Sequence, residues 1–148
     1  GDVCVDTVLG TAILFKKSDI LELGLLDENF FIYFEDDDLC RRIKLKNKSV
    51  IQIFDAKAKH VYGQLKVKNF LKKIFIRNYN FTYDELYYYF KINKHHEKYE
   101  YLKKKLPNYI IKSIINFLTL RPSQCIYYFA KVKAFYNFKK IIKQDKVK

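Results

Sequence analysis

The chain contains four consecutive acidic residues, Glu35, Asp36, Asp37 and Asp38, directly after the apolar and largely aromatic run 30–34. Neighbouring carboxylates repel one another, and an apolar wall beside them makes their charged forms still more costly. Such charges are not expected in a strand of a hydrophobic core, and such aromatic residues are not expected in a solvated loop. The combination predicts a strand or turn that delivers carboxylates to the rim of a pocket, with a helix beginning behind them.

The length of 148 residues suits one domain with a real hydrophobic core. The chain contains no methionine, so we expect it to be a piece of a longer protein. Cys4, Cys40 and Cys125 form no C-x-x-C pair, which supports neither a zinc site nor a disulfide framework. We expect a reducing cytosol as the setting. No apolar run approaches the ~18–20 residues that a membrane-spanning helix needs.

The net charge of +13 is concentrated in the second half of the chain. Residues 1–65 contain 9 Lys/Arg and 11 Asp/Glu, whereas residues 66–148 contain 20 and 5. This asymmetry predicts an anionic partner for the second half, either a membrane surface or a nucleic acid. A general bias toward Lys, Ile, Asn, Tyr and Phe explains the same excess without any partner, and the composition leaves both interpretations open.

The pattern of apolar residues changes from short segments to helical spacing near residue 66. Before that point we expect strands at 3–8, 11–15 and 50–54 and helices at 17–23 and 36–46. After it we expect a helix beginning at residue 67 and further helices at 83–91, 109–120 and 123–143. The sequence therefore predicts an α/β part, residues 1–65, followed by a basic amphipathic helical part, residues 66–148.

Several single residues predict where these elements end. Asp19 with Glu22 three residues later is typical of a capping box, and Gly24 follows as a helix stop. Asn47 suits the left-handed position after a helix. The prolines, Pro107 and Pro122, are expected to separate the later helices.

An ordered set of motifs runs through the first half of the chain: Gly10-Thr11-Ala12, Leu23-Gly24, Leu26-Asp27-Glu28, the acidic run with its aromatic lead-in, Arg42, His60 and Arg77-Asn78. In this order and at these spacings, the set resembles the second half of family 2 glycosyltransferases, most closely their rhamnosyltransferase-like branch. The resemblance is dense over residues 6–78 and thin after that. The chain departs from the family at Leu25, where a second glycine is usual, and at Leu26, where Phe is usual.

The resemblance implies the second half of a GT-A, Rossmann-like α/β domain that transfers a sugar from a nucleotide-sugar donor to a hydroxyl acceptor with inversion. It also implies that the nucleotide-binding half of the domain, with its Asp-x-Asp motif, precedes Gly1. An attacking hydroxyl must lose its proton to a nearby base. The resemblance gives this role to Asp36, whereas a helix N-cap is the structural alternative. Glu35 either orients Asp36 or binds hydroxyls of the acceptor.

The other residues of the set have supporting roles. Asp38 and Arg42 are spaced i, i+4 and can form an ion pair that fixes the helix under the site; alternatively, Arg42 balances the charge of the donor phosphates. Gly10 and Thr11 are expected at the end of a strand, where a glycine either lets a substrate approach the backbone or forms a bulge.

Further roles are implied for residues that follow the acidic run. His60 is a candidate ligand of a divalent cation, Mg²⁺ or Mn²⁺, that would neutralise charge on the leaving diphosphate. In isolation, this histidine would be interpreted as a structural or surface residue. Arg77 and Asn78 are given a docking or acceptor-side role.

The expected partners are a nucleotide-sugar donor, a glycan or lipid-linked acceptor and an anionic membrane surface; a nucleic acid is the poorer candidate because no known nucleic-acid module is present. The expected place is the cytoplasm, at the periphery of the membrane, and the expected process is cell-surface polysaccharide or glycan synthesis. We do not expect the fragment alone to be active. The alternative is a non-catalytic basic helical module that binds an anionic membrane or a nucleic acid.

Overall fold

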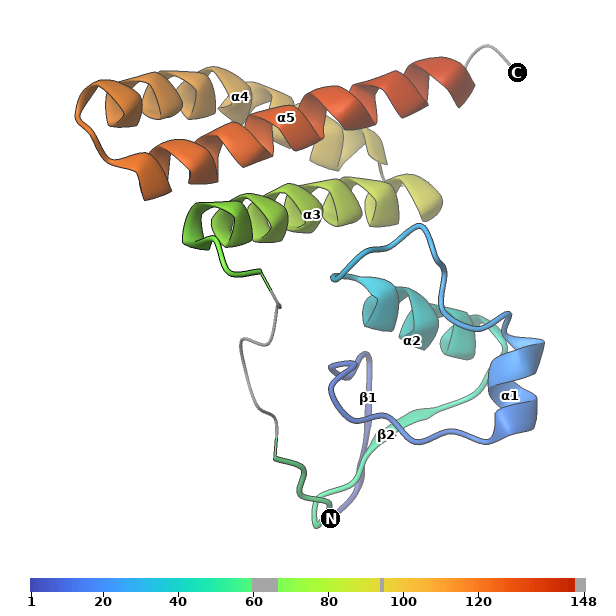
Figure 1. Cartoon of the computed structure of the whole chain (residues 1–148). Coiled ribbons are helices and arrows are strands. Elements are labelled where there is room, and N and C mark those ends of the chain that lie inside the picture. The colour runs from blue at the N-terminus through green and yellow to red at the C-terminus, as the bar shows by residue number, and fades with distance from the viewer. Residues whose placement is uncertain (60–66, 94, 146–148) are drawn as a thin grey trace. The chain divides into compact units, whose positions relative to one another are not determined.

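The computed structural model describes residues 1–59, 67–93 and 95–145 (Figure 1). The chain divides into two compact units, Gly1–Gln64 and Leu65–Lys148. The first unit contains β1 (Val3–Val5), α1 (Lys17–Glu22), α2 (Glu35–Leu45) and β2 (Val50–Gln52). The second contains α3 (Phe70–Lys91), α4 (His95–Leu118) and α5 (Pro122–Asp145).

The expected α/β, Rossmann-like GT-A fold is wrong for this chain. About 62% of the structure is helical, and strands are confined, over the described residues, to one antiparallel pair. β1 and β2 pair over three residues each, with Val3 opposite Gln52 and Val5 opposite Val50. The expected strands 3–8 and 50–54 are thus shortened, and 11–15 forms no strand. A Rossmann-like sheet requires parallel strands joined by helical crossovers, and this pair is antiparallel.

The ends of the helices in the first unit follow the expected glycine and asparagine positions. Gly24 has φ +84°, and the amide of Leu25 donates to the carbonyl of Ile20, which closes α1 with a left-handed turn. Asn47 has φ 56° and follows Lys46, the C-cap residue of α2. Both predictions are confirmed.

The capping box predicted for α1 does not form. Lys16 is the N-cap residue, and its side chain makes no capping hydrogen bond. Asp19 and Glu22 instead accept from the ammonium of Lys48, at 2.9 and 3.2 Å. These hydrogen bonds raise the pKa of Lys48 above its ordinary value. The two carboxylates therefore tie α1 to the start of β2 instead of capping their own helix.

The helices of the second unit are longer than expected. Asn69 caps α3 by accepting from the amide of Lys72 at 3.0 Å, and the helix then continues through the segment 83–91 that was expected to be separate. Pro107 lies inside α4 instead of before a helix. Pro122 is the first residue of α5, where its missing N–H removes no hydrogen bond.

The core of the second unit forms where α5 packs against both α3 and α4 (Figure 1). Its buried centre is Leu86, Leu102, Phe135 and Phe138, surrounded by partly buried aromatic and aliphatic residues. Ala130 and Ala134 are fully buried one turn apart on α5, and such small residues let neighbouring helices approach closely. Aromatic packing on a central helix thus holds this unit together.

We expect Phe138→Ala to destabilise the second unit by about 3–5 kcal/mol, because Phe138 is fully buried and its removal leaves a cavity. Phe129→Ala is the matched control, since Phe129 lies on the same helix and is 49% exposed. The control should cost less than about 1.5 kcal/mol. Chemical denaturation followed by circular dichroism measures both changes; equal losses would contradict this description of the core.

The second unit should also lose stability at alkaline pH. Burial, with smaller contributions from Tyr79 and Asp84, raises the pKa of the half-buried Tyr83 above its ordinary value of 10.0. The folded state therefore keeps the phenol proton more tightly than the unfolded state. The stabilisation is complete below pH ~10 and is lost as pH rises through the folded-state pKa.

We expect Tyr83→Phe to move the alkaline unfolding transition to higher pH, because the buried phenol can then no longer ionise. Tyr101→Phe is the contrast, since a hydrogen bond from Lys105 lowers the pKa of Tyr101. That variant should not move the transition upward. Circular dichroism against pH, read beside tyrosinate absorbance, decides between these outcomes, and an unchanged transition in Tyr83→Phe would refute the assignment.

Candidate functional site

The acidic run forms the first turn of α2. Phe34 precedes the helix in the left-handed conformation, with φ 68°, and the helix begins at Glu35. All four carboxylates therefore lie where the unpaired amides and the helix dipole favour negative charge. This position offsets part of the repulsion that the sequence implies. The predicted helix behind the carboxylates is confirmed, with its first residue at Glu35 instead of Asp36.

Asp36 is half-buried and held by two backbone donors. The amide of Gly10 donates to Oδ2 at 2.7 Å, and the amide of Asp37 donates to Oδ1 at 3.0 Å. The N-cap alternative for Asp36 is wrong, because Phe34 occupies that position. A carboxylate has about four lone-pair sites, so two donors orient this one and leave capacity for a further hydroxyl.

Gly10 lies in a turn instead of at the end of a strand. A Cβ added at Gly10 would lie 3.4 Å from the Cβ of Asp36 and 3.5 Å from its Oδ2, which is ordinary van der Waals contact. The turn thus approaches Asp36 closely, as an interaction within the protein. Gly10 therefore forms no bulge in a strand.

Asp37 is half-buried beside Asp36 and has a hydrogen-bond partner outside its own helix. The hydroxyl of Thr7 donates to its Oδ1 at 2.7 Å. Thr7 was not singled out by the sequence, because a threonine thirty residues away carries no mark of such a contact. Together, the Thr7 and Gly10 contacts attach the segment after β1 to the first turn of α2.

Asp38 and Arg42 form the predicted ion pair. The distance from Nε to Oδ2 is 2.8 Å, the Asp38 side chain is fully buried, and the Arg42 side chain is 19% exposed. The remaining guanidinium nitrogens donate to the carbonyls of Leu23 and Leu25. Arg42 is therefore directed toward the protein, which favours the structural role over contact with donor phosphates.

The other residues of the predicted set are distributed over the chain. Glu35 is half-buried at the start of α2, and Thr11 is exposed in the turn that contains Gly10. Arg77 and Asn78 lie on α3 in the second unit, where the Asn78 amide donates to the carbonyl of Ile74 at 2.8 Å. His60 lies outside the described residues.

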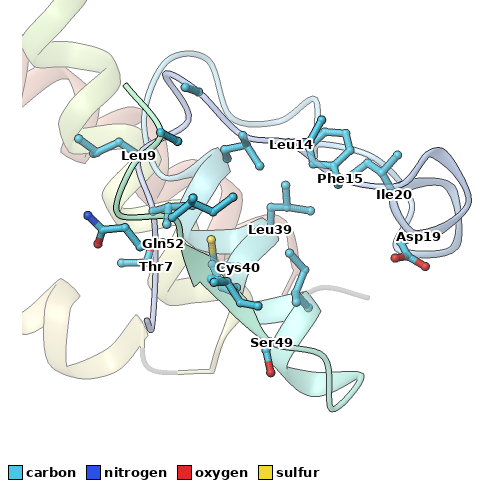
Figure 2. A pocket seen from close by; sticks show the side chains of 18 of the residues that line it. Thr7, Leu9, Leu14, Phe15, Asp19, Ile20, Leu39, Cys40, Ser49 and Gln52 are labelled. Carbon is cyan, nitrogen blue, oxygen red and sulfur yellow. The ribbon is translucent and has the colours of Figure 1, made fainter. Parts of the chain in front are cut away.

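A separate cavity of about 960 Å³ lies in the first unit (Figure 2). Its walls are largely apolar and include Leu9, Thr11, Leu14, Leu39 and Cys40. Among the described residues, no carboxylate of the acidic run lines it. The cavity wall does include Thr7, whose hydroxyl bonds Asp37, and Thr11, which follows Gly10.

The divalent cation that the resemblance implies stays a prediction, because its candidate ligand His60 lies outside the described residues. Over residues 1–59, 67–93 and 95–145, no three His, Cys, Asp or Glu side chains gather as a metal site. Asp36, Asp37 and Asp38 are engaged by Gly10, Thr7 and Arg42, respectively.

Comparison of the chain with protein-family models, curated proteins and solved structures found no match. In the part of the chain that the structure describes, no helix combines the length and apolar character needed to cross a bilayer.

We expect Arg42→Met to destabilise the first unit by about 3 kcal/mol, because it leaves the buried Asp38 carboxylate without its cation. The double variant Asp38→Asn/Arg42→Met removes both charges and should cost less than the sum of the single changes. Hydrogen exchange of the α2 amides reports the stability of this unit. Strict additivity would show that the two side chains act independently.

Proposed function

We propose that this chain carries the acceptor-side catalytic residues of an inverting glycosyltransferase, with Asp36 as the general base. The proposal rests on the ordered motif set in the sequence and on one structural observation. The Asp36 carboxylate is held by the Gly10 amide at 2.7 Å and remains only half-buried. It does not rest on a particular fold class.

Asp36 would act on the hydroxyl of a glycan or lipid-linked acceptor. The hydroxyl oxygen attacks the anomeric carbon of the donor sugar as its proton passes to a carboxylate oxygen of Asp36. The bond between that carbon and the donor diphosphate breaks on the opposite face, and its electron pair leaves with the diphosphate. One in-line displacement therefore inverts the anomeric configuration, and the proton ends on Asp36.

The neighbouring carboxylates have different roles in this proposal. Asp37 and Asp38 fix the first turn of α2, through Thr7 and Arg42, and so hold Asp36 in place. Glu35, beside Asp36, is the candidate for binding further hydroxyls of the acceptor. A general base must lie within hydrogen-bond reach of its proton, and this rigid attachment would supply that precision.

The test uses the longer protein that the sequence leads us to expect, since the donor-binding residues would lie upstream. We expect Asp36→Asn to lower kcat for sugar transfer by roughly 10²–10⁴-fold, the usual contribution of a positioned base. The affinity for the nucleotide-sugar donor, measured by calorimetry, should stay unchanged. A wild-type kcat in the Asp36→Asn variant would show that Asp36 is not the general base.

Asp37→Asn is the matched control, because it removes an adjacent charge while the asparagine side-chain oxygen can still accept from the Thr7 hydroxyl and keep the turn attached. It should lower stability slightly and leave kcat within a few-fold of wild type. If both variants lost activity equally, the acidic turn would act as a structural unit and Asp36 would not be the base. Activity lost in neither variant would leave the non-catalytic binding module as the better hypothesis.

A further inference from the structure

The outer face of α4 exposes large aliphatic side chains at helical spacing. Ile111, Ile114, Ile115 and Leu118 follow an i, i+3, i+4, i+7 pattern, and we call them the α4 stripe. They are 54, 54, 51 and 72% exposed, so this apolar row faces away from the core of the second unit. Single exposed leucines are common on protein surfaces, whereas a continuous apolar row marks a contact surface.

The apolar surface continues into the connection between α4 and α5. Phe117, in the last turn of α4, is 71% exposed, and Leu120, in the connection, is 87% exposed. Figure 1 shows that α4 and α5 run side by side and are joined at this end by a short connection. The α4 stripe thus extends onto the tip of a helical hairpin.

Cationic residues surround this surface. Lys104 lies on the same helical face as the stripe, Lys112 flanks it, and Arg121 follows Leu120 at the tip; all three are exposed. Residues 101–144 contain 10 Lys/Arg and no Asp or Glu. A row of aliphatic side chains within an exclusively cationic segment has the chemistry of a helix that lies in the interface of an anionic bilayer.

We propose that this protein docks on anionic membranes by inserting the α4 stripe and the hairpin tip between lipid headgroups. The stripe spans two turns, about 10 Å, which matches a helix lying along the interface. Its apolar face would sit at the boundary of headgroups and acyl chains, while Lys104, Lys112 and Arg121 contact lipid phosphates. This proposal stands independently of glycosyl transfer.

Two other occupants fit the surface less well. A second copy would bring two strongly cationic units together, and like charges oppose such a contact. A nucleic acid would find 18 lysines but only two arginines in residues 66–148, and it would meet exposed Ile and Leu in place of base-contacting groups. An anionic lipid surface can attract the cationic residues and can also bury the aliphatic side chains.

The first test is flotation of the full 148-residue chain with vesicles. We expect binding to phosphatidylcholine–phosphatidylglycerol vesicles and little binding to phosphatidylcholine alone, with a decline as salt is added. Ile115→Ser/Leu118→Ser should weaken the partition coefficient by more than about tenfold, because two inserted side chains are lost. Lys104→Gln and Lys112→Gln should each weaken it by about fivefold.

Leu45→Ser/Phe54→Ser is the matched control. It makes the same kind of change at two exposed apolar residues of the first unit, which are 65 and 72% exposed. This variant should bind vesicles as the wild type does. All variants alter exposed side chains, so circular dichroism should show unchanged folding. Equal binding by the stripe variant and this control would overturn the proposal.

A fluorescence test locates the contact directly, because the chain contains no tryptophan. Phe117→Trp places one indole at the hairpin tip, and Phe54→Trp places one at a similarly exposed position of the first unit. We expect anionic vesicles to shift the emission of the Trp at 117 to the blue and to shield it from acrylamide, with no change for the Trp at 54.

The remaining outcomes contradict the proposal. These are no vesicle binding at low salt, tighter binding to duplex DNA than to vesicles at the same salt, or sedimentation as a dimer that the stripe variant abolishes. None of these measurements requires transfer activity. Failure of the membrane proposal and failure of the Asp36 assignment can therefore be told apart.

Discussion

The ion pair of Asp38 and Arg42 is the contact on which the candidate site depends. It is the buried charge of α2, and Arg42 extends it to the carbonyls of Leu23 and Leu25 beyond the end of α1. One guanidinium thus holds α2 and the α1 turn together. An uncompensated buried carboxylate would be costly, so the conformation that keeps this pair is strongly favoured. The position of Asp36, two residues before Asp38, follows from it.

The first turn of α2 offsets the repulsion between its four adjacent carboxylates. The helix dipole, the amide of Gly10, the hydroxyl of Thr7 and the guanidinium of Arg42 each compensate part of the charge. Three carboxylates are distinguished by their donors, although the sequence shows them as equivalent. Asp36 combines two backbone donors with half-exposure, and we assign proton transfer to this residue.

Local patterns predicted local structure well. The helix at the acidic run, the left-handed residues Gly24 and Asn47 and the Asp38–Arg42 pair all depend on neighbours within a few residues, and all were predicted. Pairing in a sheet depends on distant segments, so the sequence could not show that 11–15 would form no strand. The Thr7–Asp37 contact was missed for the same reason. Pro107 lies exposed inside α4, so the helix continues through a residue whose local preference is to end it.

The two units differ in the charge that they carry, and the two proposals assign them different partners. The first unit concentrates carboxylates in one turn, and the second carries an excess of lysines around an exposed aliphatic stripe. A lipid-linked acceptor is confined to the bilayer, so docking of the second unit would raise its effective concentration near the chain. Docking would make binding of the acceptor more frequent, whereas Asp36 would take the proton in the chemical step. Docking would therefore alter KM for a lipid-linked acceptor, and loss of the base would alter kcat.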